Sequence, residues 1–306
     1  MTLAPITLFV YNRPAHTRRA VEALLRNELA RDSDLIIYSD APKPPEAAGT
    51  VREVRDYIRT IGGFRSVRIV GRDRNWGLAD SIIDGVTTVL NKYGRIIVLE
   101  DDLLVSPHFL EYMNASLDQY EHDNRVMQIS GYMFPLSADL EEDAIFLPFT
   151  TSWGWATWGR AWRHFDASCA AWSRIKADDM KLKAFDLGGV YPYSSMVEAQ
   201  FRGEIDSWAI RWYMSVFAHK GLVLFPRRTL VHNSGLDGSG THGEGPSMWR
   251  LNHPSDDFAV RVFPKDVSPS RAFHLVTATI AQGGASYFNR ACRWVHGILA
   301  RVQGGG

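Results

Sequence analysis

The sequence predicts an α/β fold in which a mostly parallel, twisted sheet is flanked by helices. Strand and helix patterns alternate over the first hundred residues, as they do in a parallel sheet with helical crossovers. Polar residues follow the predicted strands, and ligands of such sheets bind beyond the carboxyl ends of the strands. Three consecutive acids, Glu100, Asp101 and Asp102, follow an apolar, β-branched run. These observations predict a ligand site at one edge of the sheet.

The elements are expected in a regular order. Short apolar runs predict strands at residues 6–11, 34–38, 67–70, 96–99 and 222–225. Apolar residues at helical spacing predict helices that begin near residues 14, 50 and 75, the second ending near 60 and the third near 90. The second half lacks this alternation, and residues 145–172 hold five of the ten tryptophans. No linker divides the chain, so we expect one continuous body.

Composition narrows the class of protein. With 306 residues the chain is long enough to bury a large hydrophobic core. Its 34 basic and 34 acidic residues cancel, so net charge does not favour binding to nucleic acid or acidic lipid. Two cysteines, Cys169 and Cys292, do not form a disulfide framework, which favours a reducing compartment. The start of the chain has no basic-then-apolar signal pattern, and no stretch is apolar enough to cross a bilayer. We therefore expect a cytoplasmic protein.

The helical pattern near the end of the chain has two possible interpretations. Residues 287–302 mix aromatic and aliphatic residues with three arginines at roughly helical spacing. Such a helix either lies on an anionic membrane surface or packs on the body of the protein. A peripheral contact with the inner face of the plasma membrane is therefore one expectation, and ordinary packing is the other.

The acidic run also has two readings from its chemistry alone. Three adjacent carboxylates repel one another, so a cation among them would stabilise the fold. Oxygen ligands favour a hard ion such as Mg²⁺ or Mn²⁺, which also takes oxygens from a phosphorylated substrate. The alternative is a solvated acidic loop after a strand.

Seven short motifs, taken in order, resemble a glycosyltransferase of the GT-A fold. The set is similar to bacterial family-2-like sugar transferases, and it also resembles the N-acetylglucosaminyltransferase I group. The motifs lie at residues 10–14, 39–40, 75–81, 98–102, 152–158, 204–208 and 228–238. This resemblance implies a GT-A catalytic domain over 1–250, with a nucleotide-sugar-binding half at 1–105 and an acceptor-binding half at 106–250. Residues 251–306 would form a carboxyl-terminal extension.

The resemblance implies a metal-dependent donor site. By analogy Asp102 binds the Mn²⁺ or Mg²⁺ that bridges the donor diphosphate, while Glu100 or Asp101 holds ribose or supports the metal. His232 lies where many GT-A enzymes contact metal or diphosphate, but a single histidine is more often structural. Arg228 is expected to meet the diphosphate, near a Gly-rich segment with His242 that would close over the donor.

Three further residues are expected at the donor. Asp40 matches an acid that accepts a hydrogen bond from the donor base, and a carboxylate can read the imide N–H of uracil. The alternative is that Asp40 only starts the turn before Pro42. Arg13 precedes the first helix and either holds phosphate or solvates a loop. Asn75 lies near the donor sugar or simply begins a helix.

Asp206 is the candidate catalytic base. An inverting transfer needs a carboxylate that takes the proton of the acceptor hydroxyl. We expect Trp208 and Trp212 to exclude water around this carboxylate. Glu204 is the competing candidate, and an acid that only stabilises a helix amino terminus is the structural alternative.

The tryptophan-rich segment is expected to contribute a sugar-binding face. Aromatic faces stack on the C–H surfaces of sugars, so Trp153 or Trp155 should lie nearest the sugar, with the other tryptophans packed in the core.

The sequence therefore predicts an inverting, metal-dependent hexosyl- or N-acetylhexosaminyltransferase. Its donor would be a nucleotide sugar, most simply a UDP-sugar, and its acceptor a glycan or lipid-linked saccharide of surface polysaccharide biosynthesis. A nucleotidyltransferase is one alternative, although Tyr11-Asn12-Arg13-Pro14 is not the Gly-rich phosphate loop that class requires. A non-catalytic carbohydrate-binding protein is the other.

Overall fold

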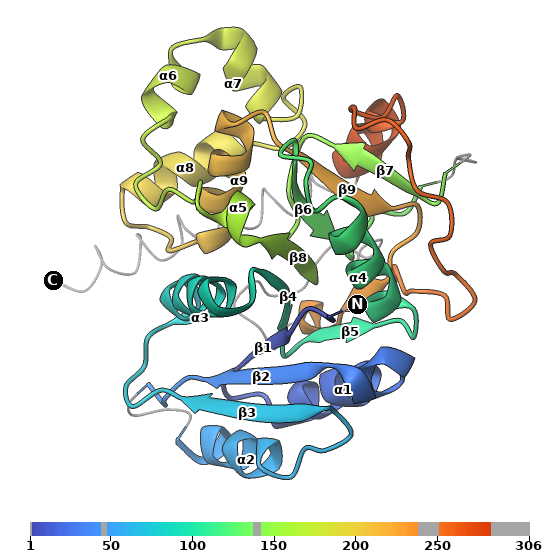
Figure 1. Cartoon of the computed structure of the whole chain (residues 1–306). Coiled ribbons are helices and arrows are strands. Elements are labelled where there is room, and N and C mark those ends of the chain that lie inside the picture. The colour runs from blue at the N-terminus through green and yellow to red at the C-terminus, as the bar shows by residue number, and fades with distance from the viewer. Residues whose placement is uncertain (1, 44–47, 137–141, 238–250, 283–306) are drawn as a thin grey trace, which may run out of the picture.

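The computed structural model describes residues 2–43, 48–136, 142–237 and 251–282. Its centre is an eight-stranded sheet in the order β3-β2-β1-β4-β8-β6-β9-β7 (Figure 1). The strands are β1 (Ile6–Val10), β2 (Asp34–Ser39), β3 (Ser66–Gly71), β4 (Arg95–Glu100), β6 (Val126–Ser130), β7 (Ala144–Leu147), β8 (Trp155–Trp158) and β9 (Leu222–Pro226). A second sheet pairs β5 (Leu103–Val105) with β10 (Val231–Asn233) in antiparallel fashion.

The sheet is mixed, and its first half is parallel. Pairings β3–β2, β2–β1, β1–β4 and β6–β9 are parallel, whereas β4–β8, β8–β6 and β9–β7 are antiparallel. The predicted α/β fold of the GT-A type is confirmed. The inserted strand β8 explains why alternation was lost in the second half, because an antiparallel neighbour needs no crossover helix.

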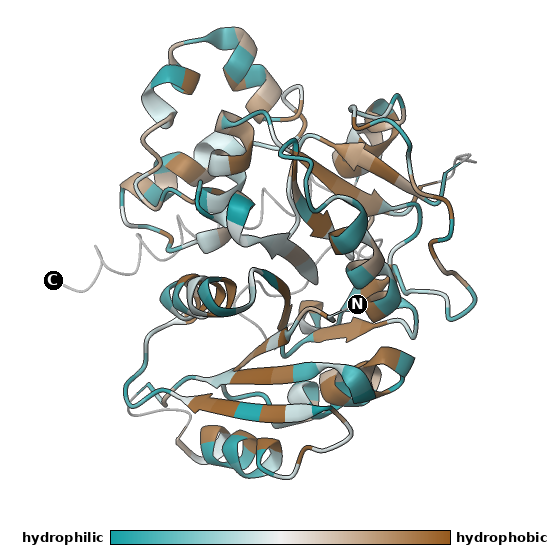
Figure 2. Ribbon diagram, viewed as in Figure 1, coloured by the Kyte–Doolittle hydropathy of each residue, from teal (hydrophilic) through white to brown (hydrophobic). Residues whose placement is uncertain are grey.

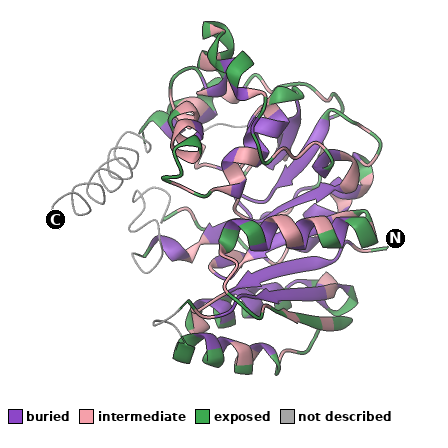
Figure 3. Cartoon of the chain, turned by 90° about the vertical axis from the view of Figure 1, so that its left-hand side faces the viewer, coloured by how far each residue is buried: buried purple, intermediate pink, exposed green. Residues whose placement is uncertain are grey.

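Helices cover both faces of the sheet. They are α1 (Pro14–Leu25), α2 (Ala48–Ile58), α3 (Leu78–Tyr93), α4 (Phe109–Gln119), α5 (Gly159–Trp162), α6 (Trp172–Lys176), α7 (Asp179–Phe185), α8 (Tyr193–Phe201) and α9 (Trp208–Ala218), with short 3-10 turns η1 (Glu28–Asp32) and η2 (Ser234–Leu236). Figure 2 shows hydrophobic strands inside and hydrophilic outer helix faces. Figure 3 shows the central strands buried, whereas the edge strand β3 is largely exposed.

Two hydrophobic cores lie on opposite faces of the sheet. On β1, Phe9 packs in the core beside α3 and α9, while Leu8 and Val10 pack in the core beside α1 and α4. This alternation follows from the two-residue period of a strand. Both faces of the central strands are therefore buried, which is why they read as continuous apolar runs.

The ends of the helices follow local chemistry. Pro14 occupies the first turn of α1, where its missing N–H costs no hydrogen bond. Helix α3 ends at Gly94, which adopts a left-handed conformation with φ of +75° and donates its N–H to the Leu90 carbonyl. The same helix begins at Leu78 instead of near residue 75, because residues 75–77 form a turn bound to Asp40.

Residues 251–282 pack against the body of the protein. Phe258 and Val260 are buried in the core beside α1 and α4. The Asp143 carboxylate accepts hydrogen bonds from the backbone N–H groups of Arg261 and Val262. The proposed helix over 287–302 lies outside the described residues. Within the described ranges no helix is both long and apolar enough to cross a bilayer.

Candidate active site

The acidic run lies at the carboxyl end of β4, in the middle of the large sheet. Strand β4 pairs with β1 on one side and with β8 on the other, and Glu100 is in register with Phe9. Asp101 and Asp102 form the turn that leads into β5. The predicted placement of these acids at the end of a buried strand is confirmed. The parallel pairing with β1 brings them to the start of α1.

Arg13, just before α1, joins two of the acids. Its Nη2 lies 2.7 Å from Asp101 Oδ1 and 2.9 Å from Asp102 Oδ2. Asp101 also accepts a hydrogen bond of 3.4 Å from the Tyr11 N–H. Asp101 is buried, whereas the Asp102 side chain is 14% exposed. Of the two paired aspartates, Asp102 is therefore the more open to a ligand.

One guanidinium does not balance three carboxyl groups. Burial, followed by the charges of Asp102 and Asp101, raises the pKa of Glu100 to about 8. Burial also raises the pKa of Asp101 to about 6, although Arg13 opposes the shift. The raised pKa values of both carboxyl groups mean that this site disfavours further negative charge. A cation would be stabilised here.

Ser234 and Gly235, which are far from the acids in the sequence, pack against this ion pair. The Ser234 N–H and hydroxyl donate to the Asp102 carbonyl at 2.8 and 2.9 Å. A Cβ added at Gly235 would overlap Asp102 Oδ2 and would lie 2.9 Å from Arg13 Nη1. Only glycine fits at this close approach without displacement of its neighbours. The same segment also approaches α1, where His16 Nε2 lies 3.2 Å from Asp237 Oδ2.

The donor set suits a cation shared with a phosphorylated ligand. Among the residues described, no three His, Cys, Asp or Glu side chains are grouped as a complete metal cage. Mg²⁺ commonly binds through only one or two carboxylates and takes its other ligands from water and substrate phosphates. Asp102 meets that requirement. The excess negative charge around it also fits a divalent ion.

His232 lies on the short second sheet, next to the segment that covers the acids. It lies in β10 opposite Leu104, is buried, and stacks on His253 with ring centroids 3.9 Å apart. Burial, followed by His253, lowers the pKa of His232, so its imidazole is neutral near pH 7. Its role as a metal ligand stays a prediction. His242 and residues 238–250 lie outside the described residues.

Asp40 organises the loop between β3 and α3. Its carboxylate accepts hydrogen bonds of 2.9 Å from the backbone N–H groups of Trp76, Gly77 and Ala41. Asn75 donates from Nδ2 to the Ala41 carbonyl at 2.7 Å. The bond to the Ala41 N–H fits the turn expected for Asp40, whereas Asn75 does not begin a helix, because α3 starts at Leu78 with Gly77 before it. Their contact with a donor base or sugar stays a prediction.

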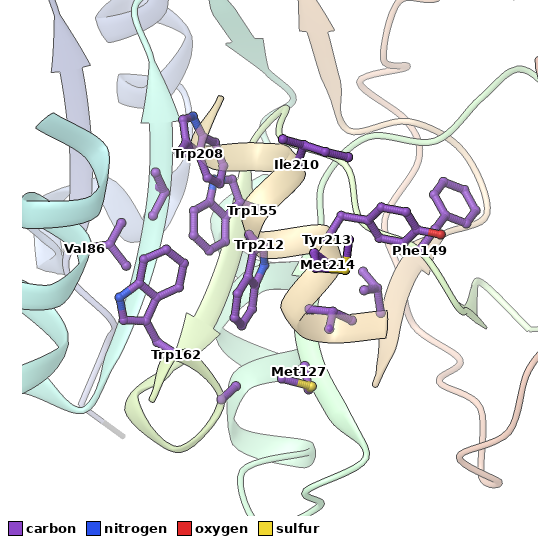
Figure 4. Packing of buried hydrophobic residues seen from close by; sticks show 14 of the residues in the cluster. Val86, Met127, Phe149, Trp155, Trp162, Trp208, Ile210, Trp212, Tyr213 and Met214 are labelled. Carbon is purple, nitrogen blue, oxygen red and sulfur yellow. The ribbon is translucent and has the colours of Figure 1, made fainter. Parts of the chain in front are cut away.

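The tryptophan-rich segment is mostly core. Trp155 is only 1% exposed and stacks on Trp208 at a centroid distance of 5.1 Å, beside Trp162 and Trp212 (Figure 4). We correct the expectation for Trp155, because a fully packed indole has no face left for a sugar. Trp153 is partly exposed and makes an edge contact with Tyr132, so the sugar-binding expectation rests on Trp153.

Asp206 lies on the surface just before α9. Its side chain is 62% exposed and forms an ion pair with Arg211. Trp208 and Trp212 are turned into the core, so they do not enclose this carboxylate as expected. The difference arises because both tryptophans lie on the core-facing side of α9, whereas Asp206 precedes the helix and is open to solvent. Glu204 pairs with Arg202 at 2.6 Å.

Arg228 is exposed, with its guanidinium carbon 6.0 Å from the centroid of the Phe258 ring. In the part of the chain that is described, Arg228 forms no hydrogen bond or ion pair with the acids after β4. Its contact with a diphosphate stays a prediction.

Sequence reasoning missed several residues of this region. His16, Ser234 and Asp237 carry no local signal, because their partners are far away in the chain. Arg72 was not expected to act here either, yet its guanidinium carbon lies 3.9 Å from the Trp76 ring centroid and 5.0 Å from that of Tyr38. A conserved pattern across homologous chains is the kind of signal that would have found them.

The raised pKa of Glu100 predicts a pH-dependent stability. The folded protein keeps this carboxyl protonated up to pH about 8, whereas its ordinary value is 4.5. Between these values the folded state binds more protons than the unfolded state, so stability falls as pH rises. In the presence of a chelator, Glu100→Gln should therefore gain a few degrees in Tm over the wild type from pH 5 to pH 8. Parallel Tm curves for the two proteins would contradict the assignment.

Comparison with known proteins gives the family. A model of glycosyl transferase family 2 matches residues 6–169, more than half of the chain. No curated protein sequence gives a significant match. Among solved structures, S. aureus TarS 1-349 is 10% identical with a TM-score of 0.41, over 76% of this chain and 61% of that one. The chain thus spans less than two thirds of that relative.

Two further structures are similar at the same low level. Mannosyltransferase PcManGT from Pyrobaculum calidifontis, in complex with GDP-Man and Mn²⁺, is 9% identical with a TM-score of 0.40, over 99% of this chain and 80% of that one. Mouse xyloside xylosyltransferase 1, in its apo form, is 12% identical with a TM-score of 0.38, over 71% and 82% of the two chains. The family model covers strands β1 to β8 and the acids after β4, and on that match the chain belongs to glycosyl transferase family 2.

Proposed function

We propose that this protein transfers a sugar, with inversion, from a nucleotide-sugar donor to a glycan or lipid-linked acceptor in surface polysaccharide biosynthesis. The observation that carries the proposal is the cluster of Arg13, Asp101 and Asp102 at the carboxyl end of β4, in a family-2 chain. The donor is proposed to be a UDP-sugar and the metal Mn²⁺ or Mg²⁺. Within the family we retain the resemblance to the N-acetylglucosaminyltransferase I group.

The residues have distinct proposed roles. Asp102 would hold the divalent cation, which when bound neutralises charge on the departing diphosphate. Arg13, anchored by the buried Asp101, would place its guanidinium against the same diphosphate. Ser234 and Gly235 hold the backbone of the closing segment against Asp102 and keep this edge of the site compact.

Asp206 is the proposed base. Its carboxylate would accept the proton of the acceptor hydroxyl as that oxygen forms a bond to the anomeric carbon and the nucleoside diphosphate leaves. The exposure of Asp206 is consistent with access to an acceptor that arrives from solvent. The ion pair with Arg211 orients the carboxylate at the start of α9.

Family membership weakens the two alternative functions. Neither a nucleotidyltransferase nor a non-catalytic carbohydrate-binding protein is needed to account for acids at the end of β4 in this family. A cytoplasmic location, with peripheral contact at the inner face of the plasma membrane, is part of the proposal and follows from cysteine usage and residues 287–302.

A donor panel tests the proposal directly. Purified full-length protein is incubated with UDP-, GDP- and dTDP-sugars, with Mn²⁺, Mg²⁺ or chelator, and the released nucleotide is measured. We expect one donor to release nucleoside diphosphate only when metal is present. In a parallel reaction with added pyrophosphate, formation of a nucleoside triphosphate and a sugar 1-phosphate would indicate a nucleotidyltransferase. No release of nucleoside diphosphate from any donor would overturn the proposal.

A further inference from the structure

A pocket of about 440 Å³ lies along one side of α3, outside the cluster around Asp102. Its helical wall consists of Asp80, Ile83, Asp84 and Thr87, which share a helix face through their spacing of three and four residues. The opposite side of α3, with Ile82 and Val86, faces the core. The volume lies in the range of small-ligand sites, about 300–1,000 Å³.

The remaining wall comes from the loop that Asp40 holds. Arg74, Asn75 and Trp76 line the pocket, and the Trp76 backbone N–H is bound to the Asp40 carboxylate. The pocket therefore lies next to Asp40, one of the residues expected to contact the donor. Its position is fixed by hydrogen bonds that need no ligand.

The indole of Trp76 is held in place before any ligand arrives. The Arg72 guanidinium lies 3.9 Å from its ring centroid and pairs with Asp84 on α3 at 2.5 Å. Arg72 thereby connects the loop that carries Trp76 to helix α3. Such support reduces the entropy lost when a ligand binds. Trp76 Nε1 is buried and has no acceptor among the described residues, so the wall keeps an unsatisfied donor.

Two charged side chains of the pocket, Arg74 and Asp80, have hydrogen-bonding capacity left for a ligand, although the Arg74 guanidinium carbon also lies 5.6 Å from the Trp76 ring centroid. Among the residues that the structure describes, neither Arg74 nor Asp80 forms a hydrogen bond or an ion pair, although both line the same pocket. A carboxylate can accept two hydroxyl groups and a guanidinium can donate to oxygens beside them. An aromatic ring next to these groups offers a surface for C–H groups.

This combination selects a polyhydroxylated ligand. A phosphate would meet the negative charges of Asp80 and Asp84, with Arg72 already paired to Asp84. A purely apolar ligand would leave Asp80 and Arg74 desolvated and without partners. Hydroxyl groups both donate and accept, so a sugar satisfies both groups at once. We propose that the pocket beside α3 is a saccharide-binding subsite.

The saccharide has two sources, the acceptor glycan and the sugar of the donor. Only this choice rests on the proposed function, because the chemistry of the pocket is the same for both. The experiment therefore uses free saccharides and nucleotide sugars as separate probes.

The test follows the Trp76 indole by NMR. Full-length protein labelled with ¹⁵N-tryptophan is titrated with methyl glycosides and short homo-oligosaccharides of glucose, mannose and N-acetylglucosamine, then with UDP-sugars and with UDP alone. The Trp76 indole resonance is identified by its loss in Trp76→Phe. We expect a saturable shift of this resonance with at least one free saccharide or one UDP-sugar.

Substitutions locate the binding. Asp80→Asn and Arg74→Gln change exposed side chains and should each weaken the affinity about tenfold, the size expected for a hydrogen bond to a charged group. Asp73→Asn makes the same charge change as Asp80→Asn just outside the pocket and should leave the affinity within about twofold.

The outcomes separate this subsite from the proposed function. A shift with free saccharides assigns the acceptor, and a shift with a UDP-sugar but not UDP assigns the donor sugar. A shift with UDP alone, no shift with any probe, or unchanged affinity in Asp80→Asn and Arg74→Gln would overturn the subsite. Diphosphate release without an indole shift overturns the subsite alone, and a shift without release overturns the proposed transfer alone.

Discussion

Asp102→Asn should reduce metal-dependent release of nucleoside diphosphate by about 10²–10⁴-fold, since several kcal/mol of leaving-group stabilisation would be lost. Asp102 is the more open of the two aspartates that Arg13 pairs, and it lies directly under Gly235. Asparagine keeps the size of the side chain, and Arg13 keeps its contact with Asp101. The measurement is turnover of the active donor at saturating metal.

A control and a binding measurement sharpen this result. Asp56→Asn also removes one carboxylate from an ion pair with arginine, at 2.7 Å, but on the exposed face of α2, and should leave turnover unchanged. Calorimetric titration of UDP into the wild type should give heat only with Mn²⁺ or Mg²⁺ present. Tight binding of UDP without metal would rule out a metal bridge through Asp102.

Asp206→Asn should abolish transfer while UDP affinity is retained. The amide cannot take the proton of the acceptor hydroxyl, and loss of a general base commonly lowers rates by about 10²–10⁴-fold. Asp206 is exposed and its neighbours Trp208 and Trp212 belong to the core, so the substitution leaves packing intact. The measurement compares kcat for transfer with the dissociation constant for UDP.

Glu204→Gln is the matched comparison for this prediction. Glu204 lies two residues earlier and pairs with Arg202, and its substitution should leave transfer largely intact. If Glu204→Gln abolishes transfer and Asp206→Asn does not, the two roles are exchanged. If Asp206→Asn weakens UDP binding as much as transfer, Asp206 contacts the donor and is not the base.

Features encoded by neighbouring residues were predictable. The β-branched run of β4 and the acids after it were recognised together, because strand period and charge are local properties. The parallel order of the first strands then brought Arg13 to these acids across 88 positions. That contact was implied by topology, because the carboxyl ends of parallel strands meet at one edge.

Long-range contacts set the limit of prediction. Asp40 and Asn75 looked available to a donor, yet both hold the turn before α3 through partners as much as 37 positions away. Trp153 and Trp155 were equivalent on sequence grounds. Only the insertion of β8 between β4 and β6 placed Trp155 in the core on one face of the sheet, where Trp162, Trp208 and Trp212 pack against it.

The sequence by itself determined the α/β fold, the family motifs and the acids at the end of β4, since each depends on residues close together in the chain. The tertiary structure decided which side chains remain open to ligands. It buried Trp155, left Asp206 exposed, placed Gly235 against Asp102 and formed the pocket beside α3. Exposure depends on which distant elements pack against a residue, and a one-dimensional pattern does not specify that packing.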